Sequence, residues 1–274
     1  QNIDKSAKTR LGLCIQDLNR AEFILLFIQR KWHGLTWWKA GKDPRQQNHA
    51  ASQGAREFDR FKPAFKWLRP LSHIFRPRPP QQLKSPLCAQ HLASDWIWRP
   101  TFWQTPVTHP ALSGAGNGVA LNDEIKMFHN ADHAQITSRQ IVQTGQKTIP
   151  AFGLSLDVYD FSSGYISLAI RLPAPAAKNL QKHHLLCLGY ALKIRKPLTI
   201  YARLNVENGP NTAEVIVKFP DNCENSTVKF DLSSVKFAER RIKNIWVDLI
   251  FEAPAMNKIT LEDIIFSRHP RAKL

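Results

Sequence analysis

Hydrophobic and polar residues alternate with a period of two along the second half of the chain, which is the spacing of β-strands. In "YISLAIRL", for example, Ile166, Leu168, Ile170 and Leu172 fall on one face. The pattern predicts strands at 124–129, 134–142, 152–161, 164–172, 184–194, 198–206, 213–219, 226–232, 244–252 and 258–267. Turn residues separate these segments at intervals typical of sandwiches. We therefore expect a mainly β fold, an antiparallel β-sandwich of the jelly-roll kind.

One predicted strand differs from the others in its pattern. The segment "NIWVDLIFE" is apolar on both faces apart from Asp248, which is typical of a strand in the middle of a sheet. The connections between the predicted strands are too short for repeated crossover helices, so the pattern argues against a parallel α/β sheet.

The first part of the chain has a different periodicity. Residues 9–33 carry apolar side chains at helical spacing, and Gly34 is a suitable end for that helix. An extended segment follows that is basic, aromatic and interrupted by proline. Residues 94–110 are expected to be a structured lead-in, and "SGAGNG" (113–118) a flexible hinge. We accordingly divide the chain into residues 1–118 and a sandwich domain, 119–274.

Charge is concentrated in the first part. The whole chain has a formal net charge of +16. Residues 1–119 contain 18 Lys/Arg and 7 Asp/Glu, a balance of +11, and residues 120–274 contain 20 and 15, a balance of +5. Cations interleave with aromatic rings in this arm, and its candidate partner-binding residues are Trp37, Trp38, Lys39, Arg60, Phe61, Lys66, Trp67, Arg69, Arg76 and Arg78. Such a mixture suits an acidic protein groove, nucleic acid or membrane headgroups. The alternative is an arm that wraps its own domain.

A second candidate surface is the strand "LTIYARLNV" and the turn "ENGPNT" that follows it. The alternation places Tyr201, Arg203 and Asn205 on one face, and Asn208 and Asn211 lie at the turn. Tyrosine can stack on a sugar ring, while Arg and Asn can bond to hydroxyl groups, so this set is a candidate glycan site. The alternative is that Arg203 pairs with a cross-strand acid and that the asparagines only build the turn.

Signals of catalysis and cofactor binding are weak. The sequence has no G-x-S-x-G nucleophile elbow, and "SGAGNG" leads into a strand rather than a helix, so it does not match a phosphate-binding loop. His129, Asp132 and His133 are close in sequence, but such residues near a turn are more often solvated than metal-bound. We expect no enzyme activity, no cofactor and no metal. No apolar run reaches the length of a membrane span, so we expect a cytoplasmic bacterial protein or one peripheral to a membrane or an assembly.

Several segments together resemble a known family. They are "SDWIWRPTFW", "YISLAIRLP", "IYARLNVENGPNT", "IWVDLIFEAPAMN" and "FSRHPRAKL", and they extend over roughly residues 94–274. They resemble an uncharacterised family of alphaproteobacterial proteins of the Rhodobacter and Roseobacter kind, a domain of unknown function. The order of the strands is also similar, more loosely, to galactose-binding-like carbohydrate-binding modules.

These observations lead to three functional hypotheses. The first is a non-enzymatic binding or structural protein whose basic aromatic arm anchors the sandwich to a larger protein assembly. The second is glycan recognition at Tyr201, Arg203 and Asn205, as the resemblance to carbohydrate-binding modules implies. The third is association with nucleic acid through the arm, driven by the release of counterions from phosphates.

Overall fold

The structure is a computed structural model that describes residues 94–114, 116–144, 150–162, 164–220, 225–233, 235 and 237–271. The chain divides into two compact units, Gln1–Arg76 and Pro77–Leu274, and every described residue belongs to the second. The predicted helix at 9–33 and all ten candidate residues of the arm lie outside the described residues.

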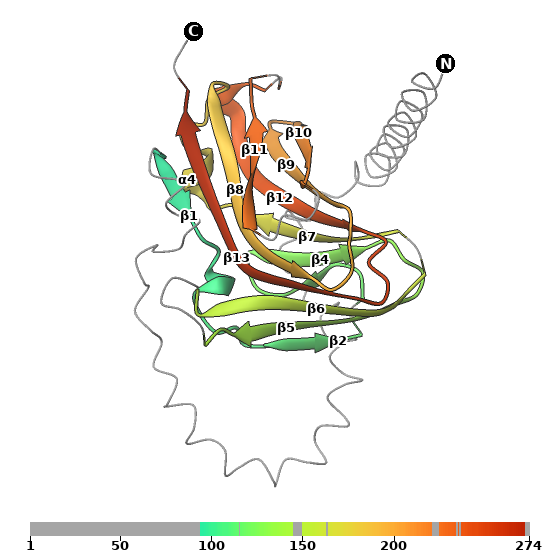
Figure 1. The fold of residues 1–274 in the computed structure, drawn as a ribbon. Coiled ribbons are helices and arrows are strands. Elements are labelled where there is room, and N and C mark those ends of the chain that lie inside the picture. The colour runs from blue at the N-terminus through green and yellow to red at the C-terminus, as the bar shows by residue number, and fades with distance from the viewer. Residues whose placement is uncertain are drawn as a thin grey trace, which may run out of the picture. The chain divides into compact units, whose positions relative to one another are not determined.

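The described residues form two antiparallel sheets, which we call sheet A and sheet B (Figure 1). The spatial order of sheet A is β11 (Asn225–Asp231), β8 (His184–Ile194), β13 (Asn257–Pro270), β6 (Phe152–Phe161), β5 (Ala134–Val142) and β2 (Ala111–Ser113). A short strand, β1 (Trp96–Trp98), also pairs with β13.

Sheet B packs against sheet A and has six strands. Their order is β10 (Asn211–Lys218), β9 (Ile200–Asn208), β12 (Ile242–Glu252), β7 (Tyr165–Arg171), β4 (Ile125–His129) and β3 (Val119–Ala120). The helical elements among the described residues are short: η3 (Thr101–Trp103), α4 (Ala174–Ala177) and η4 (Glu239–Arg241). Successive strands from β6 to β9 and from β10 to β13 alternate between the sheets, as in jelly-roll sandwiches.

The predicted fold class is confirmed, and each of the ten predicted strands is present. Three of them, β5, β6 and β8, have the predicted bounds, and the others differ by one to three residues at an end. The apolar segment around Asp248 forms β12, which lies between β9 and β7 in the middle of sheet B as predicted. The pattern did not reveal β1, β2 and β3, because strands of two or three residues are too short to show a period.

The hydrophobic core lies between the two sheets. On β7, the inward-facing residues Ile166, Leu168 and Ile170 are all fully buried. Leu186 and Leu188 of β8 contribute to the same core from sheet A. The period of two in the sequence therefore reflects the burial of one side of each strand.

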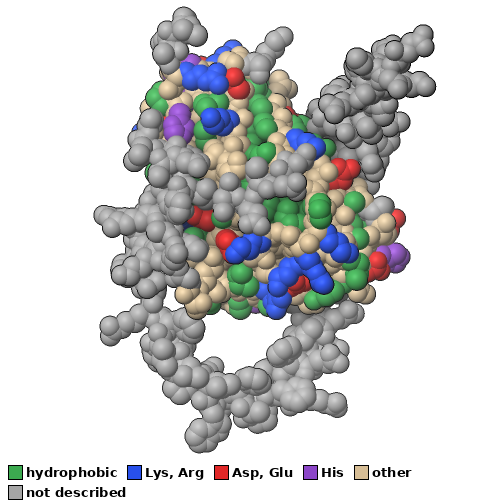
Figure 2. Space-filling model, viewed as in Figure 1, with side chains coloured by type: hydrophobic (Ala, Val, Ile, Leu, Met, Phe, Trp, Pro, Cys, Tyr) green, Lys and Arg blue, Asp and Glu red, His purple; other side chains and the backbone are tan. Residues whose placement is uncertain are grey.

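Charged side chains on sheet A are arranged as ion pairs. Figure 2 shows Lys and Arg side chains gathered toward the lower part of the visible face, with Asp and Glu side chains among them. Within sheet A, Arg139 bonds to Asp157 and Lys193 bonds to Glu262. Both basic side chains are largely exposed, at 48% and 62%, so these pairs contribute little to stability.

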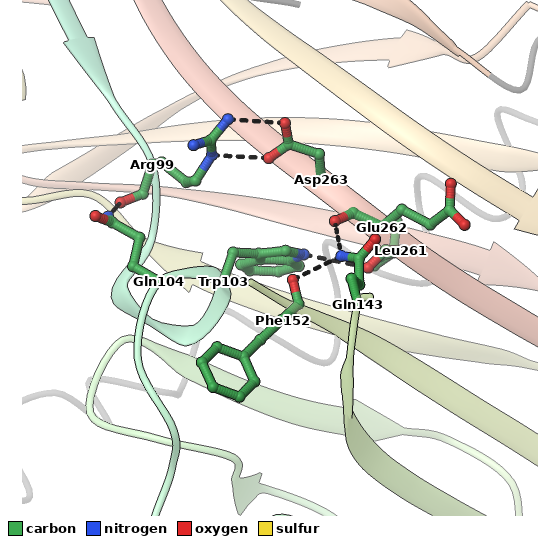
Figure 3. A network of polar contacts seen from close by, with 8 residues as sticks. All are labelled: Arg99, Trp103, Gln104, Gln143, Phe152, Leu261, Glu262 and Asp263. Atoms are coloured by element: carbon green, nitrogen blue, oxygen red, sulfur yellow. Dashed lines mark hydrogen bonds and ion pairs between the residues drawn. The ribbon is translucent and has the colours of Figure 1, made fainter. Parts of the chain in front are cut away.

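The lead-in segment before residue 119 is built into the sandwich (Figure 3). The Arg99 guanidinium donates two hydrogen bonds of 2.9 Å to the Asp263 carboxylate on β13, and both side chains are buried. The indole Nε1 of Trp103, which is fully buried, donates to the Leu261 carbonyl at 3.1 Å. Since β1, η3 and β2 all precede residue 119, the described sandwich includes residues that we expected to lie outside it.

A bulge in β13 lies among these contacts of the lead-in segment. The register between β13 and β8 shifts between Leu261 and Asp263. The Gln143 side-chain amide donates to the Glu262 carbonyl at the bulge, at 2.6 Å, and to the Phe152 carbonyl at 2.8 Å (Figure 3). A bulge leaves backbone groups without ladder partners, and here a glutamine side chain satisfies one of them.

Candidate functional site

The strand β9 brings three of the predicted site residues to one surface, the outer face of sheet B. Its even-numbered residues from Ile200 to Val206 point into the core, so Tyr201, Arg203 and Asn205 point outward. This shared face was the geometric basis of the predicted site. However, Arg203 and Asn205 are 3% and 1% exposed, which is unusual for polar residues on the outer side of a sheet.

Neighbouring strands add a second set of side chains to this face. On β12, Trp246, Asp248 and Ile250 lie opposite Asn205, Arg203 and Tyr201, in that order, and on β10, Glu214, Ile216 and Lys218 lie opposite the same three residues. Two rows thus flank β9, and each contains an acidic residue. The next strand beyond β12 is β7, which places the small residues Ser167 and Ala169 opposite Ile250 and Asp248.

A buried ion pair occupies the centre of this face. Arg203 donates from Nε and Nη2 to the same oxygen of Asp248, Oδ2, at 3.0 and 2.7 Å. Asn205 Nδ2 donates to that oxygen as well, at 2.9 Å. On the other side of the guanidinium, Glu214 Oε2 lies 4.0 Å from Arg203 Nη1. This is the cross-strand pairing that the sequence left open as the alternative role of Arg203.

The environment of Asp248 acts on its pKa in two directions. Burial raises the pKa of Asp248 above its ordinary value, because a charged carboxylate loses its hydration. The charge and hydrogen bonds of Arg203, the Asn205 amide and the Trp246 indole lower the pKa, but burial is the stronger effect. Ionising Asp248 in the folded protein therefore costs free energy, and its hydrogen-bond partners offset only part of that cost.

Among the described residues, four buried polar atoms on the outer face of sheet B make no hydrogen bond of ordinary length and angle. They are Asp248 Oδ1, Trp246 Nε1, Glu214 Oε2 and Ser167 Oγ. The Trp246 indole lowers the pKa of Asp248 through a side-chain hydrogen bond whose geometry is poorer than that of the bonds from Arg203 and Asn205. Buried polar atoms in proteins are nearly always hydrogen-bonded, so this group on adjacent strands makes the outer face of sheet B the candidate site.

The other predicted residues of this region lie elsewhere. Asn208 and Asn211 face each other across the turn between β9 and β10, where Gly209 has a φ of 64°. Asn208 has the parity of the core-facing residues of β9, so it does not join Arg203 on the outer face. The two asparagines flank the turn and are not part of the cluster.

Metal-binding and membrane-spanning features are not found in the described part of the chain. No group of three or more His, Cys, Asp or Glu residues is arranged to hold a metal ion within the described ranges. The same part of the chain contains no helix with the length and apolar character needed to cross a bilayer.

Sequence reasoning missed the residues with unpartnered atoms, although one signal was present. Asp248 is the single charge inside an otherwise apolar segment, and a charge in a central strand must be paired or functional. Glu214, Trp246 and Ser167 carried no such signal, because their positions relative to Asp248 depend on which strands are neighbours.

Solved structures that this chain resembles in fold include carbohydrate-binding modules. A family 11 module from Clostridium thermocellum, in complex with a β-1,3-1,4-mixed-linked tetrasaccharide, has a TM-score of 0.36 and 10% identity, covering 59% of this chain and 98% of the module. The CBM22-1 xylan-binding domain of Paenibacillus barcinonensis Xyn10C has a TM-score of 0.32 and 10% identity, covering 66% and 98%. The enzymatically active domain of tailspike protein 4 of bacteriophage CBA120 has a TM-score of 0.38 and 8% identity over 53% of this chain, which spans 19% of the tailspike chain.

A comparison with curated proteins found no significant match. A protein-family comparison, in contrast, matches residues 76–274, which include every strand of both sheets and the cluster around Asp248. The chain therefore belongs to the family of unknown function DUF6478.

Proposed function

We propose that the protein is a non-catalytic binding protein that recognises a hydroxyl-rich ligand, a glycan, on the outer face of sheet B. The observation that carries this proposal is the group of buried polar atoms around Asp248 that make no hydrogen bond of ordinary geometry. The group includes carboxylate acceptors, an indole donor and a hydroxyl that can do both. Ligand hydroxyl groups complement such a mixture, because each can donate one hydrogen bond and accept others.

The arrangement of the two carboxylates favours binding over hydrolysis. Glycosidases place two carboxyl groups on opposite sides of the scissile bond. Asp248 and Glu214 instead flank one guanidinium, that of Arg203, on the same sheet face. A ligand would therefore meet both acids from one side, which is suited to holding hydroxyl groups.

The roles of the residues differ from those predicted from the sequence. Arg203 and Asn205 direct donors to Asp248 Oδ2, so they orient this carboxylate for a ligand. Asp248, Glu214 and Trp246 are the residues that would contact the ligand. Tyr201 is half-buried beside them and can supply a ring for stacking on a sugar.

The test is glycan-array binding by the full-length protein, followed by titration of the best ligands. The wild type should bind at least one glycan, and Trp246→Phe and Glu214→Gln should weaken that binding about tenfold each. Glu262→Gln is the matched control, since Glu262 is an ion-paired carboxylate on sheet A, and it should bind like the wild type. Thermal unfolding of each variant checks that the fold is kept. Absence of binding to any array glycan by folded wild type would refute the proposal.

The charge of the N-terminal region favours a second proposal, an anchor to a larger protein assembly. Residues 1–119 carry a balance of +11, mixed with aromatic side chains. We propose that full-length protein isolated from native cells, after nuclease treatment, retains a defined set of proteins. A variant with Arg69, Arg76 and Arg78 changed to Glu should lose that set. If the wild type instead binds labelled single-stranded RNA with an affinity that falls steeply with salt, the arm is a nucleic-acid-binding segment.

A further inference from the structure

The strands at the ends of the two sheets differ in length. Two of them, β2 and β3, have only three and two residues, whereas β10 and β11 have eight and seven. A short edge strand protects a sheet from pairing with another chain, and a long one is a template for such pairing. The exposed lysine Lys229 near the middle of β11 discourages pairing there. In β10 the lysine stands at the last position, after the half-buried apolar run 215–217.

One row of β10 backbone groups faces away from β9. The two strands pair in antiparallel register, and at the next position of that register the Phe219 N–H donates to the Ile200 carbonyl at 2.9 Å. Hydrogen-bonded pairs alternate along an antiparallel ladder, so the odd-numbered residues of β10 bond to β9. The residues whose N–H and C=O groups point to the other side are Thr212, Glu214, Ile216 and Lys218. Among the described residues, no strand pairs with β10 on that side (Figure 1).

Charge complementarity favours a second copy of β10 as the strand that pairs there. If two antiparallel copies are related by a two-fold axis at Ile216, Glu214 of each copy lies opposite Lys218 of the other, because both stand two residues from Ile216. An axis at Glu214 would place two glutamates opposite each other, and an axis at Lys218 two lysines. Like charges directly opposite each other destabilise a sheet, and opposite charges stabilise it.

The backbone and the core-facing side chains suit the same register. Each of the pairs centred on Ile216 would exchange two backbone hydrogen bonds, since its groups point to the shared edge. On the core-facing side, Val215 of each copy lies opposite Val217 of the other, and β-branched pairs stabilise a sheet. The ladder would end where Thr212 meets Pro220 of the second copy, because proline has no N–H to donate.

We infer that two copies of this chain pair through β10, antiparallel about Ile216, and join their two B sheets into one continuous sheet. This inference does not depend on the proposed glycan-binding function. The pairing would bring the two outer faces of sheet B side by side, so that a dimer could contact a long ligand at two places.

The first experiment is sedimentation velocity of the full-length protein over a hundredfold range of micromolar concentrations. The wild type should form a species of twice the 31.3 kDa chain mass. Ile216→Pro removes an N–H that points away from β9, so β10 should stay in the sheet while the dimer dissociation constant rises about tenfold or more. Ile216→Thr is the matched control, because it keeps both the N–H and a β-branched side chain, and it should remain dimeric. Thermal unfolding checks that each variant is folded.

The second experiment tests the register by exchanging charges. Glu214→Lys and Lys218→Glu each place like charges opposite each other, so each protein alone should dimerise at least about tenfold more weakly than the wild type. An equal mixture of the two should recover the dimer, since lysines of one copy then face glutamates of the other. A monomeric wild type, or a dimer that resists Ile216→Pro, would overturn the inference. A mixture that dimerises no better than its components would overturn the register about Ile216.

Discussion

Replacing Arg203 by alanine tests the arrangement at the centre of sheet B. Arg203 is 3% exposed and Asp248 is 0% exposed, so the substitution leaves a buried carboxylate without its cation. Removing one partner of a buried ion pair costs about 3–5 kcal/mol. For a domain of roughly 150–250 residues, each kcal/mol lowers Tm by about 2–4 °C, so Tm should fall by about 6–20 °C.

The pKa of Asp248 gives this prediction a pH dependence. Burial raises the pKa in the folded protein above the ordinary value of 3.8, so the contribution of Asp248 to stability is complete below that value and is lost as the pH rises through the folded-state pKa. Arg203→Ala removes the charge and hydrogen bonds that lower this pKa, so the pKa rises further. The stability deficit of the variant should therefore be largest at neutral pH and shrink in acid, as Asp248 becomes protonated.

The assay is thermal and urea-induced unfolding of the full-length protein between pH 4 and 8. Arg271→Ala is the control, because Arg271 forms an ion pair with Asp231 in which both side chains are exposed, at 44% and 46%. This control should change stability by about 0–1 kcal/mol. The double variant Arg203→Met with Asp248→Asn removes both charges and should recover most of the loss. An Arg203→Ala protein as stable as the Arg271→Ala protein at pH 7 would refute the reasoning.

Three further predictions concern other parts of the sandwich. Burial, and next the charge of Arg268, lower the pKa of His184 below 6.5, so the contribution of His184 to stability should be complete above about pH 6.5 and should be lost as the pH falls through the folded-state pKa. His184→Gln should flatten this part of a Tm-versus-pH curve, and an unchanged slope would contradict the role of His184. Trp103→Phe leaves the buried Leu261 carbonyl without the indole donor and should cost about 1–3 kcal/mol in urea unfolding, whereas a neutral result would show that this hydrogen bond does not stabilise the sandwich. Gly164→Ala would place a Cβ 2.0 Å from Asn130 Oδ1 at a φ of +103°, so it should lower Tm by several degrees, and a wild-type Tm would contradict the turn geometry.

The family match and the fold leave the ligand to be identified by experiment. DUF6478 is a family of unknown function, so it supplies no site residues for comparison. The chemistry of the cluster around Asp248 is its own evidence: one oxygen of the buried carboxylate accepts three hydrogen bonds, and the other makes none of ordinary geometry among the described residues. Variants at Trp246 and Glu214 address it directly without removing the central ion pair.

Local pattern was enough to determine the class of fold. Strand residues alternate between two faces, so burial of one face leaves a period of two that can be read without knowing which strands are neighbours. The same reasoning placed Tyr201, Arg203 and Asn205 on one surface and identified the segment around Asp248 as a central strand. These are properties of single strands, and the sequence by itself determined them.

Only the tertiary structure decided what those residues do. Pairing of β9 with β12 places Asp248 opposite Arg203, 45 positions away in the chain, and pairing with β10 brings Glu214 opposite Asn205. Strands in an antiparallel sandwich can pair in many orders, and their register depends on contacts between distant segments, which no local period records. The three residues of β1 are too few to show a period, and they form a strand because β13 offers them an edge.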